Sequence, residues 1–263
     1  MKRKKVEAFS RASELLLCKV SQLSLVQLWA DPQTKLSAKA IEEYRGLVER
    51  RCLGEPLAYL LGEKEFYGRS FFVTRDTLIP RPETEHLVDW IKESFGEDEA
   101  FSFYDVGCGS GVIAISVALE RPKSKAFAVD LSEAALKVAK KNADFHGASV
   151  HWIHGDLLSK CNAPLDCVVA NLPYIPSSQI SGLQSELGFE PRAALDGGDD
   201  GLVYIEKLTG QAWSTLKPEG LYFLEFGSDQ ADRVRVILEQ QGFKDITIKK
   251  DLAGCMRLSR AIR

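Results

Sequence analysis

The sequence has 263 residues, of which 45% are apolar and 27% are charged. A chain of this length can hold one large α/β domain and a small accessory domain, because domains mostly contain roughly 100–200 residues. The composition excludes a disordered chain, and no apolar run approaches the ~20 residues that a membrane helix needs. The basic start Met1–Lys5 is followed by Glu7 and Arg11 rather than by an apolar stretch, so we expect no secretory signal and a cytoplasmic protein. We also predict a monomer.

Charge is distributed unevenly along the chain. The net charge of −3 combines +5 over residues 1–75 with −8 over residues 76–263. The overall pI near 5.9 makes nucleic acid an unlikely main ligand, since such domains usually carry a basic face. The basic first part can steer an acidic partner, although a solvated helical surface explains it equally well. The cysteines and histidines form no cluster with metal-ligand spacing, so we expect no metal.

The first third of the chain changes character twice. Apolar residues at helical spacing predict short helices over 7–62, with Ser37 as the N-cap of one of them. Residues 65–79 begin with an aromatic and β-branched stretch around a Gly turn, which predicts a hairpin. The two prolines of segment 79–84 favour an extended chain, with a helix beginning near Thr84.

The remainder alternates between strand and helix patterns, which predicts a doubly wound, mostly parallel sheet of the Rossmann-like class. The last two strands follow each other without a helix, so they should form an antiparallel hairpin that completes seven strands. Expected helices are 111–120, 132–146, 199–216 and 228–241; expected strands are 101–106, 125–130, 149–153, 165–170, 219–226, 244–250 and 256–262. The predicted division is therefore 1–64, a helical domain; 65–79, a hairpin linker; and 80–263, the α/β domain.

A glycine-rich turn follows the first strand of the α/β part. It reads Asp-Val-Gly-Cys-Gly-Ser-Gly from Asp105 to Gly111 and opens a helix. Glycines allow close approach of a ligand to the backbone, and the free N–H groups of the helix start face it. Dinucleotide folds use a similar turn, but the preceding carboxylate of Asp105 suits a cationic amino acid better than a pyrophosphate.

Two more acidic residues follow strands. Asp130 ends the second strand and can bind both hydroxyls of a ribose, although it also suits the start of the helix after Ser132. Asp156, followed by Leu157, comes after the third strand and can accept from an adenine amino group. A turn residue explains Asp156 equally well.

The most informative motif is Asn171-Leu172-Pro173-Tyr174, which follows the apolar strand Val168-Val169-Ala170. A planar amide or exocyclic amine is a poor nucleophile, because its nitrogen lone pair is delocalised. The side-chain oxygen of Asn171 and a backbone carbonyl of Leu172 or Pro173 can accept from both hydrogens of its NH2 group. Tyr174 offers a face for stacking. The motif therefore predicts methyl transfer from a sulfonium donor to such a nitrogen, with in-line positioning as the main catalytic effect.

Taken together, these segments resemble the HemK/PrmC family of protein-(glutamine-N5) methyltransferases, which modify the Gly-Gly-Gln motif of peptide chain release factors. The resemblance covers nearly the whole chain. It rests on the hairpin Glu65–Gly68, the segment Leu78-Ile79-Pro80-Arg81-Pro82-Glu83-Thr84-Glu85, the glycine loop, Asn171–Tyr174, Phe189–Leu195 and Asp251–Arg257.

The resemblance implies a class I methyltransferase fold that uses S-adenosyl-L-methionine, with class 1 release factors as its protein substrate and the helical domain as a docking surface. Catalysis would rest on Asn171, Pro173 and Tyr174, and substrate binding on these three with Leu172, Arg81 and Glu83. The donor would be bound by Asp105, Gly107, Cys108, Gly109, Ser110, Gly111, Asp130, Leu131, Asp156, Leu157 and Asn171.

One departure keeps an alternative open. The family usually has proline where this chain has Leu172, and Asn-Leu-Pro-Tyr also occurs in rRNA adenine N6-dimethyltransferases. The 79–84 segment and the position of the helical part before the catalytic part argue against that alternative. Outside methyl transfer, the glycine turn leaves two further readings, a dinucleotide-binding dehydrogenase and a module that binds the donor without chemistry.

Overall fold

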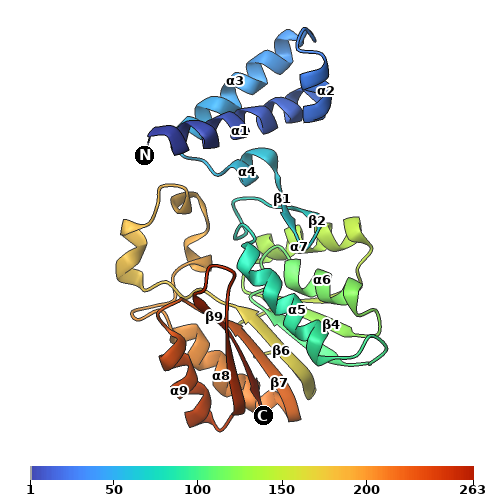
Figure 1. Cartoon of the computed structure of the whole chain (residues 1–263). Coiled ribbons are helices and arrows are strands. Elements are labelled where there is room, and N and C mark those ends of the chain that lie inside the picture. Colours follow the sequence, from blue (N-terminus) through green and yellow to red (C-terminus); the bar gives the residue numbers. More distant parts are fainter. Residues whose placement is uncertain (1) are drawn as a thin grey trace.

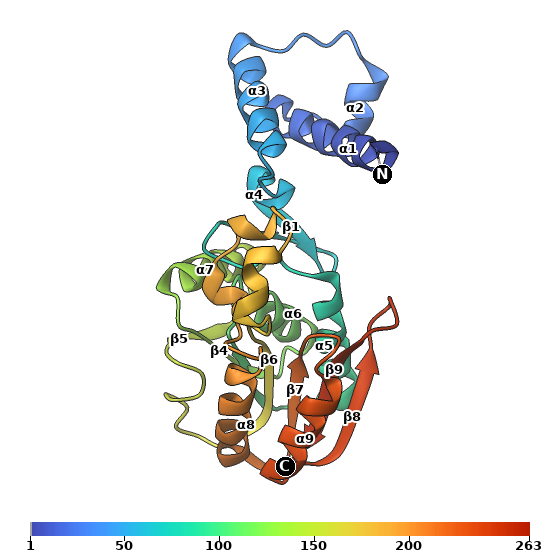
Figure 2. The ribbon, with the colours of Figure 1, turned by 90° about the vertical axis from the view of Figure 1, so that its left-hand side faces the viewer.

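The computed structural model describes residues 2–263, with side chains from Ser10 onward. Met1 and the side chains of residues 2–9, including most of the basic start, lie outside the described residues. A group of helices stands at one end of the molecule, above a sheet that carries helices on both faces (Figure 1). Turning the molecule shows that α4 and the first hairpin connect the two parts (Figure 2).

The helical part consists of α1 (Lys2–Ser21), α2 (Leu25–Ala30), α3 (Ala38–Cys52) and α4 (Leu57–Leu61). Ser37 caps α3 as predicted, because its side chain accepts a hydrogen bond from Ala40 N. Leu16, Leu47 and Leu60 bury their side chains against one another, so α1, α3 and α4 share one small core. This core is separate from the two larger ones that cover the sheet.

A buried carboxylate fastens α3 and α4 to the chain that follows. Glu55 pairs with Arg50 (2.7 Å) and with Arg75 (2.8 Å), which lies beyond the hairpin. These two cations lower the pKa of Glu55 to about 2, with the Arg50 hydrogen bond as the largest contribution. Arg51 extends the connection to Glu186 in the long loop before α8 (2.6 Å). The helical part is therefore held both to the chain that follows the hairpin and to the long loop before α8.

The hairpin β1 (Glu63–Phe66) and β2 (Arg69–Phe72) packs onto the sheet domain. Phe66 and Phe71 are fully buried in the same core as α5. The buried Asn142 of α7 accepts from Phe72 N (2.7 Å) and donates to Phe72 O and Ser110 O. One amide thus joins the hairpin to the glycine turn.

The sheet has the predicted class, with strand order β5-β4-β3-β6-β7-β9-β8. Six strands run in the same direction, and β9 runs antiparallel between β7 and β8. The strands are β3 (Ser102–Val106), β4 (Lys125–Asp130), β5 (Val150–His154), β6 (Leu165–Asn171), β7 (Leu216–Glu225), β8 (Lys244–Lys250) and β9 (Met256–Ile262). Strand β6 lies in the middle, which explains its continuous apolar run, since both faces of a central parallel strand are covered.

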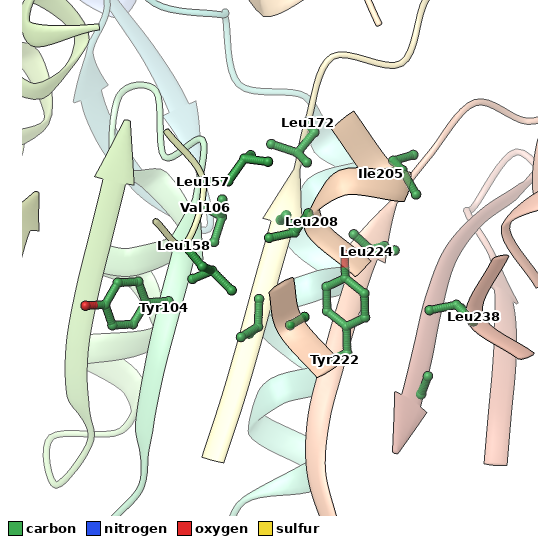
Figure 3. Packing of buried hydrophobic residues seen from close by; sticks show 14 of the residues in the cluster. Tyr104, Val106, Leu157, Leu158, Leu172, Ile205, Leu208, Tyr222, Leu224 and Leu238 are labelled. Atoms are coloured by element: carbon green, nitrogen blue, oxygen red, sulfur yellow. The ribbon is translucent and has the colours of Figure 1, made fainter. Parts of the chain in front are cut away.

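Helices cover both faces of this sheet. On one face, the 3-10 turn η1 (Pro82–Thr84) leads into α5 (Glu85–Ser94), beside α6 (Val112–Glu120) and α7 (Glu133–His146); α8 (Val203–Thr215) and α9 (Ala231–Gln241) cover the other. Figure 3 shows α8 residues Ile205 and Leu208 packed over the strands. Helix α8 begins four residues later than predicted, since Gly201 has a left-handed φ of +78°. Three 3-10 turns, η2 (Ser177–Gly182), η3 (Leu187–Phe189) and η4 (Arg192–Ala194), shape the preceding loop.

Replacing Asn142 by alanine tests the link between hairpin and glycine turn. The variant leaves three backbone groups without their partner, so we expect the free energy of unfolding to fall by roughly 2–4 kcal/mol. Urea denaturation measures this change. Asn162→Ala, at an exposed position, is the matched control and should change the value by about 0.5 kcal/mol or less. Equal midpoints for the two variants would show that the link does not stabilise the fold.

Candidate active site

The sheet has one position where its strand order reverses. Strand β3 pairs with β4 on one side and with β6 on the other, and the helices that follow β3 and β6 lie on opposite faces. Ligands of open α/β sheets bind in the crevice at such a point, outside the carboxyl ends of the strands. The glycine turn follows β3 and Asn171 ends β6, so both predicted motifs lie at this crevice.

The glycine turn presents its backbone rather than its side chains. Gly107, Gly109 and Gly111 all adopt left-handed φ values, between +53° and +82°. A side chain at Gly109 would project into open space, with no described atom within 4 Å. Cys108 and Ser110 between them are buried. The accessible part of the turn is therefore the backbone of Gly107 and Gly109.

Asp105 lies beneath this turn and is 1% exposed. Its Oδ2 accepts from Ala114 N in the first turn of α6 (3.0 Å), while its Oδ1 has no hydrogen-bond partner among the described residues. Burial raises the pKa of this carboxyl to about 7, against the opposing effect of the Ala114 hydrogen bond. An unpaired buried oxygen at a ligand crevice fits a cationic group bound just above it.

Asp130 stands on the opposite side of the turn, at the end of β4. Its Oδ2 accepts from Gly109 N (2.8 Å) and its Oδ1 from Ser132 N (2.8 Å). Each carboxylate oxygen can accept a further bond, so the side chain orders the glycine turn and still has capacity for two hydroxyl groups. The following residue, Leu131, is 67% exposed and offers an apolar surface beside it.

Asp156 and Leu157 follow β5 and differ in their surroundings. Asp156 is half exposed and pairs with Lys207 of α8 (2.5 Å). Leu157 has a left-handed φ of +50° and is buried in the core. Figure 3 shows its side chain and that of Leu172 at the same end of the sheet. Leu157 can therefore form the floor of a ligand site, with only its edge and its backbone accessible.

A cavity of about 180 Å³ lies at the end of β6. Four of the predicted substrate residues line it: Asn171, Leu172, Tyr174 and Arg81. Its remaining wall is apolar and comes from Leu78, Ile175, Leu187, Ala194 and Leu195. The last three belong to the loop before α8, which therefore covers the cavity. The volume suits a single planar side chain rather than a larger ligand.

A buried hydrogen-bond chain holds Asn171 in place. Asn171 Nδ2 donates to Thr84 Oγ1 (3.0 Å), and Thr84 Oγ1 donates to Glu225 Oε2 (2.7 Å). Tyr174 OH lies 3.5 Å from the other oxygen of Glu225. Thr84 and Glu225 are almost fully buried. The side-chain oxygen of Asn171 is left to accept from a ligand.

The backbone after Asn171 is held by a second set of contacts. Gln230 Nε2 donates to Tyr174 O (2.9 Å) and to Gly201 O (3.3 Å). Gly197 lies so close that a Cβ there would come within 2.8 Å of Pro173 O. Only glycine fits at position 197, because Pro173 O lies too close for a side chain. Segment 197–201 thereby holds the backbone carbonyls that follow Asn171.

Arg81 and Glu83 lie at the edge of this arrangement. Arg81 Nη2 pairs with the buried Glu190 (2.5 Å), which also accepts from Ile79 N. Arg81 therefore shapes the cavity and ties segment 79–84 to the covering loop. Glu83 is absent from the cavity lining, although its charge raises the pKa values of Tyr174 and Glu225.

Sequence reasoning named Thr84 and Glu190 only within segments, Thr84 also as the expected start of a helix, and it missed Glu225, Gln230 and Lys207. A signal existed for Glu225, which ends an apolar strand in the same way that Asn171 does. Gln230 precedes α9 and Lys207 lies on α8, and only their packing brings them to the site.

Two family models match separate parts of the chain. A family model described as "Methyltransferase small domain" matches residues 83–198, and one described as "PrmC N-terminal domain" matches residues 1–62. The release factor glutamine methyltransferase of Coxiella burnetii is 41% identical over 95% of this chain and 91% of its own length. That of Neisseria gonorrhoeae is 40% identical over 94% and 91%.

Solved structures share the fold at low sequence identity. A methyltransferase of Pyrococcus furiosus superposes with a TM-score of 0.56 at 15% identity, covering 81% of this chain and 97% of that one. A ribosomal protein L11 methylase of Lactobacillus delbrueckii gives 0.53 at 19% identity, covering 70% and 80%. The fold and the crevice together define an S-adenosylmethionine-dependent methyltransferase of class I. Within that class, the chain belongs to the release factor glutamine methyltransferase family.

Gly197→Ala tests whether the segment 197–201 positions the second carbonyl. The added methyl must displace Pro173 O or the segment itself, and a shift of about 1 Å can lower turnover roughly 100-fold. We expect a loss of kcat between about 10-fold and 100-fold, measured with saturating donor and protein substrate. Gly46→Ala, on α3 with no described atom within 4 Å of the added methyl, is the control and should keep normal turnover. An unchanged kcat in Gly197→Ala would contradict the assignment.

Proposed function

We propose that this chain transfers a methyl group from S-adenosyl-L-methionine to the side-chain nitrogen (N5) of the glutamine in the Gly-Gly-Gln motif of class 1 release factors. The observation that carries the proposal is the orientation of Asn171, whose Nδ2 is engaged by Thr84 so that its oxygen is left for a ligand amide. Family membership supports the same substrate, and the relatives' shared name favours it over an RNA adenine.

The donor fits the crevice. The backbone of Gly107–Gly111 would hold its methionine part above the unpaired oxygen of Asp105, and Asp130 would accept from the ribose hydroxyls. Asp156 would accept from the adenine amino group, between Leu131 and the edge of Leu157. When bound, this cofactor supplies an electrophilic methyl group on a sulfonium sulfur.

The substrate amide is made reactive by orientation. Asn171 Oδ1 and the carbonyl of Leu172 or Pro173 accept from the two hydrogens of its NH2 group, and Tyr174 packs beside its plane. The two acceptors favour positive charge that develops on nitrogen as the new bond forms. On transfer, the substrate nitrogen would gain the methyl group, the donor sulfur would keep the electron pair of the S–CH3 bond that breaks, and one amide hydrogen would leave to solvent as a proton. The remaining wall of the cavity is apolar, which disfavours competing water.

Asn171→Ala should remove one acceptor while leaving the crevice intact. Loss of a single such group lowers kcat by roughly 100- to 1000-fold. The measurement is labelled methyl transfer to purified release factor, with mass spectrometry of the Gly-Gly-Gln peptide. Affinity for S-adenosylhomocysteine, measured by calorimetry, should change far less. Ribosomal RNA serves as the competing substrate, and labelled RNA beside unlabelled release factor would refute the glutamine assignment.

The protein substrate would dock where the helical part meets the sheet domain, in the cytoplasm and with this chain acting as a monomer. A cavity of about 1100 Å³ lies there. Its walls come from α1 and α4, from the hairpin and from residues 182–190 of the covering loop. A surface of this extent beside the small cavity suits the body of a large substrate, with its Gly-Gly-Gln loop entering at Asn171. The domain division 1–64, 65–79 and 80–263 remains part of this proposal.

Leu15→Asp tests this docking surface, since Leu15 lines the large cavity and is not part of the helical core. A charge placed there opposes apolar contact, so we expect KM for full-length release factor to rise roughly 10-fold. Methylation of a short Gly-Gly-Gln peptide should be unaffected. Val26→Asp, exposed on α2 and outside the cavity, is the control. Equal KM values for Leu15→Asp and the unmodified protein would remove this surface from the proposal.

A further inference from the structure

Three segments that are distant in sequence meet behind Asn171. Asn171 ends β6 and Glu225 ends β7, and the two residues are register partners on neighbouring parallel strands. Thr84 closes the 3-10 turn that begins at Pro82 and places its hydroxyl between them. Thr84 is 3% exposed and Glu225 is 1% exposed, so water does not compete for these hydrogen bonds.

The hydroxyl of Thr84 has one proton. The residue to which it donates this proton decides whether Asn171 turns its oxygen or its NH2 group toward the substrate. An ionised carboxylate only accepts hydrogen bonds, so the Thr84 proton must point to Glu225 Oε2. The Thr84 oxygen then has only lone pairs for its other neighbour. Asn171 can meet those lone pairs only with its NH2 group, which turns its Oδ1 away from Thr84.

We propose that Thr84 and Glu225 are positioning residues that fix the side-chain amide of Asn171 in the one rotamer able to accept from a substrate NH2 group. This inference rests on the proposed function for the identity of the substrate, but not for the orientation itself. A flipped Asn171 would present its own NH2 group to that of the substrate, so that two donors would face each other. The two orientations fill the same volume, so packing alone cannot choose between them.

The charge state of Glu225 controls this choice. Burial raises the pKa of Glu225 to about 7, and the negative charge of Glu83 adds to the rise. The hydrogen bond from Thr84, the charge of Arg257 on β9 and the hydroxyl of Tyr174 lower the pKa. Above about pH 7 the carboxylate is ionised and the orientation is fixed. Below that value a protonated Glu225 can donate to Thr84, which frees the Thr84 proton for Asn171 Oδ1.

The kinetic test uses isosteric variants of both residues. Thr84→Val removes the hydroxyl and Glu225→Gln removes the charge, and each should lower kcat roughly 10- to 100-fold, because the acceptor is lost in the flipped rotamer. KM for the donor should change less than about 2-fold in both. Thr84→Ser should recover most of the turnover that Thr84→Val loses. Thr247→Val, exposed on β8, is the matched control.

Two further kinetic results separate positioning from a general structural role. The double variant Thr84→Val, Glu225→Gln should be no more than about 2-fold slower than the slower single variant, because both act through the same hydroxyl. With saturating donor, whose cationic part would hold Asp105 in its charged form, the unmodified enzyme should lose kcat as the pH falls through about 7, and Glu225→Gln should lack this limb. Additive losses in the double variant, or an unchanged pH profile in Glu225→Gln, would overturn the proposal.

Orientation can also be measured without substrate. In protein labelled with ¹⁵N on asparagine side chains, the NH2 resonance that disappears in Asn171→Ala belongs to Asn171. We expect one of its protons to exchange slowly in the unmodified protein and to lose this protection in Thr84→Val. Identical spectra would refute the orientation. If the spectra change as expected while no release factor is methylated, the proposed substrate fails and the positioning roles stand.

Discussion

The register between β6 and its two parallel neighbours is the constraint on which the site depends. Val106 of β3 lies opposite Ala170, and Glu225 of β7 lies opposite Asn171, so three strands end at the same level. The loops that follow parallel strands all begin at the same edge of the sheet. The glycine turn, the Asn171 loop and the Glu225 carboxyl therefore lie together at the carboxyl ends of these three strands. A slip of one residue would turn Asn171 to the opposite face of the sheet.

Two buried carboxyls, Asp105 and Glu225, lie on the two sides of the crevice. The pKa values of Asp105 and Glu225 are both raised to about 7, chiefly because the surroundings exclude water. Unpaired or half-paired carboxyls of this kind lower the stability of a fold. They persist at sites where a charge is needed. Asp105 leaves one oxygen for the donor side, whereas Glu225 acts on the substrate side through Thr84.

Close packing joins the donor side to the substrate side. Leu172 stands where the sequence comparison led us to expect proline. Its side chain is almost fully buried, although the residue also lines the substrate cavity. A Cβ at Gly107 would come within 2.9 Å of it, so the residue after Asn171 packs directly on the glycine turn. Gly197 holds the next carbonyl from the other side. Leu172 therefore packs against the glycine turn, and no described residue occupies its backbone oxygen.

The sequence by itself determined the alternation of strands and helices, the closing hairpin, the glycine turn and the position of Asn171 at a strand end. These features follow from local patterns, since apolar periodicity, glycine and proline act within a few residues. Only the tertiary structure decided that Thr84 and Glu225 stand behind Asn171, that Gln230 holds Tyr174 O, and that Leu157 is buried. Thr84 and Asn171 are 87 residues apart in sequence, and no local pattern encodes a contact that forms only when the strands pair.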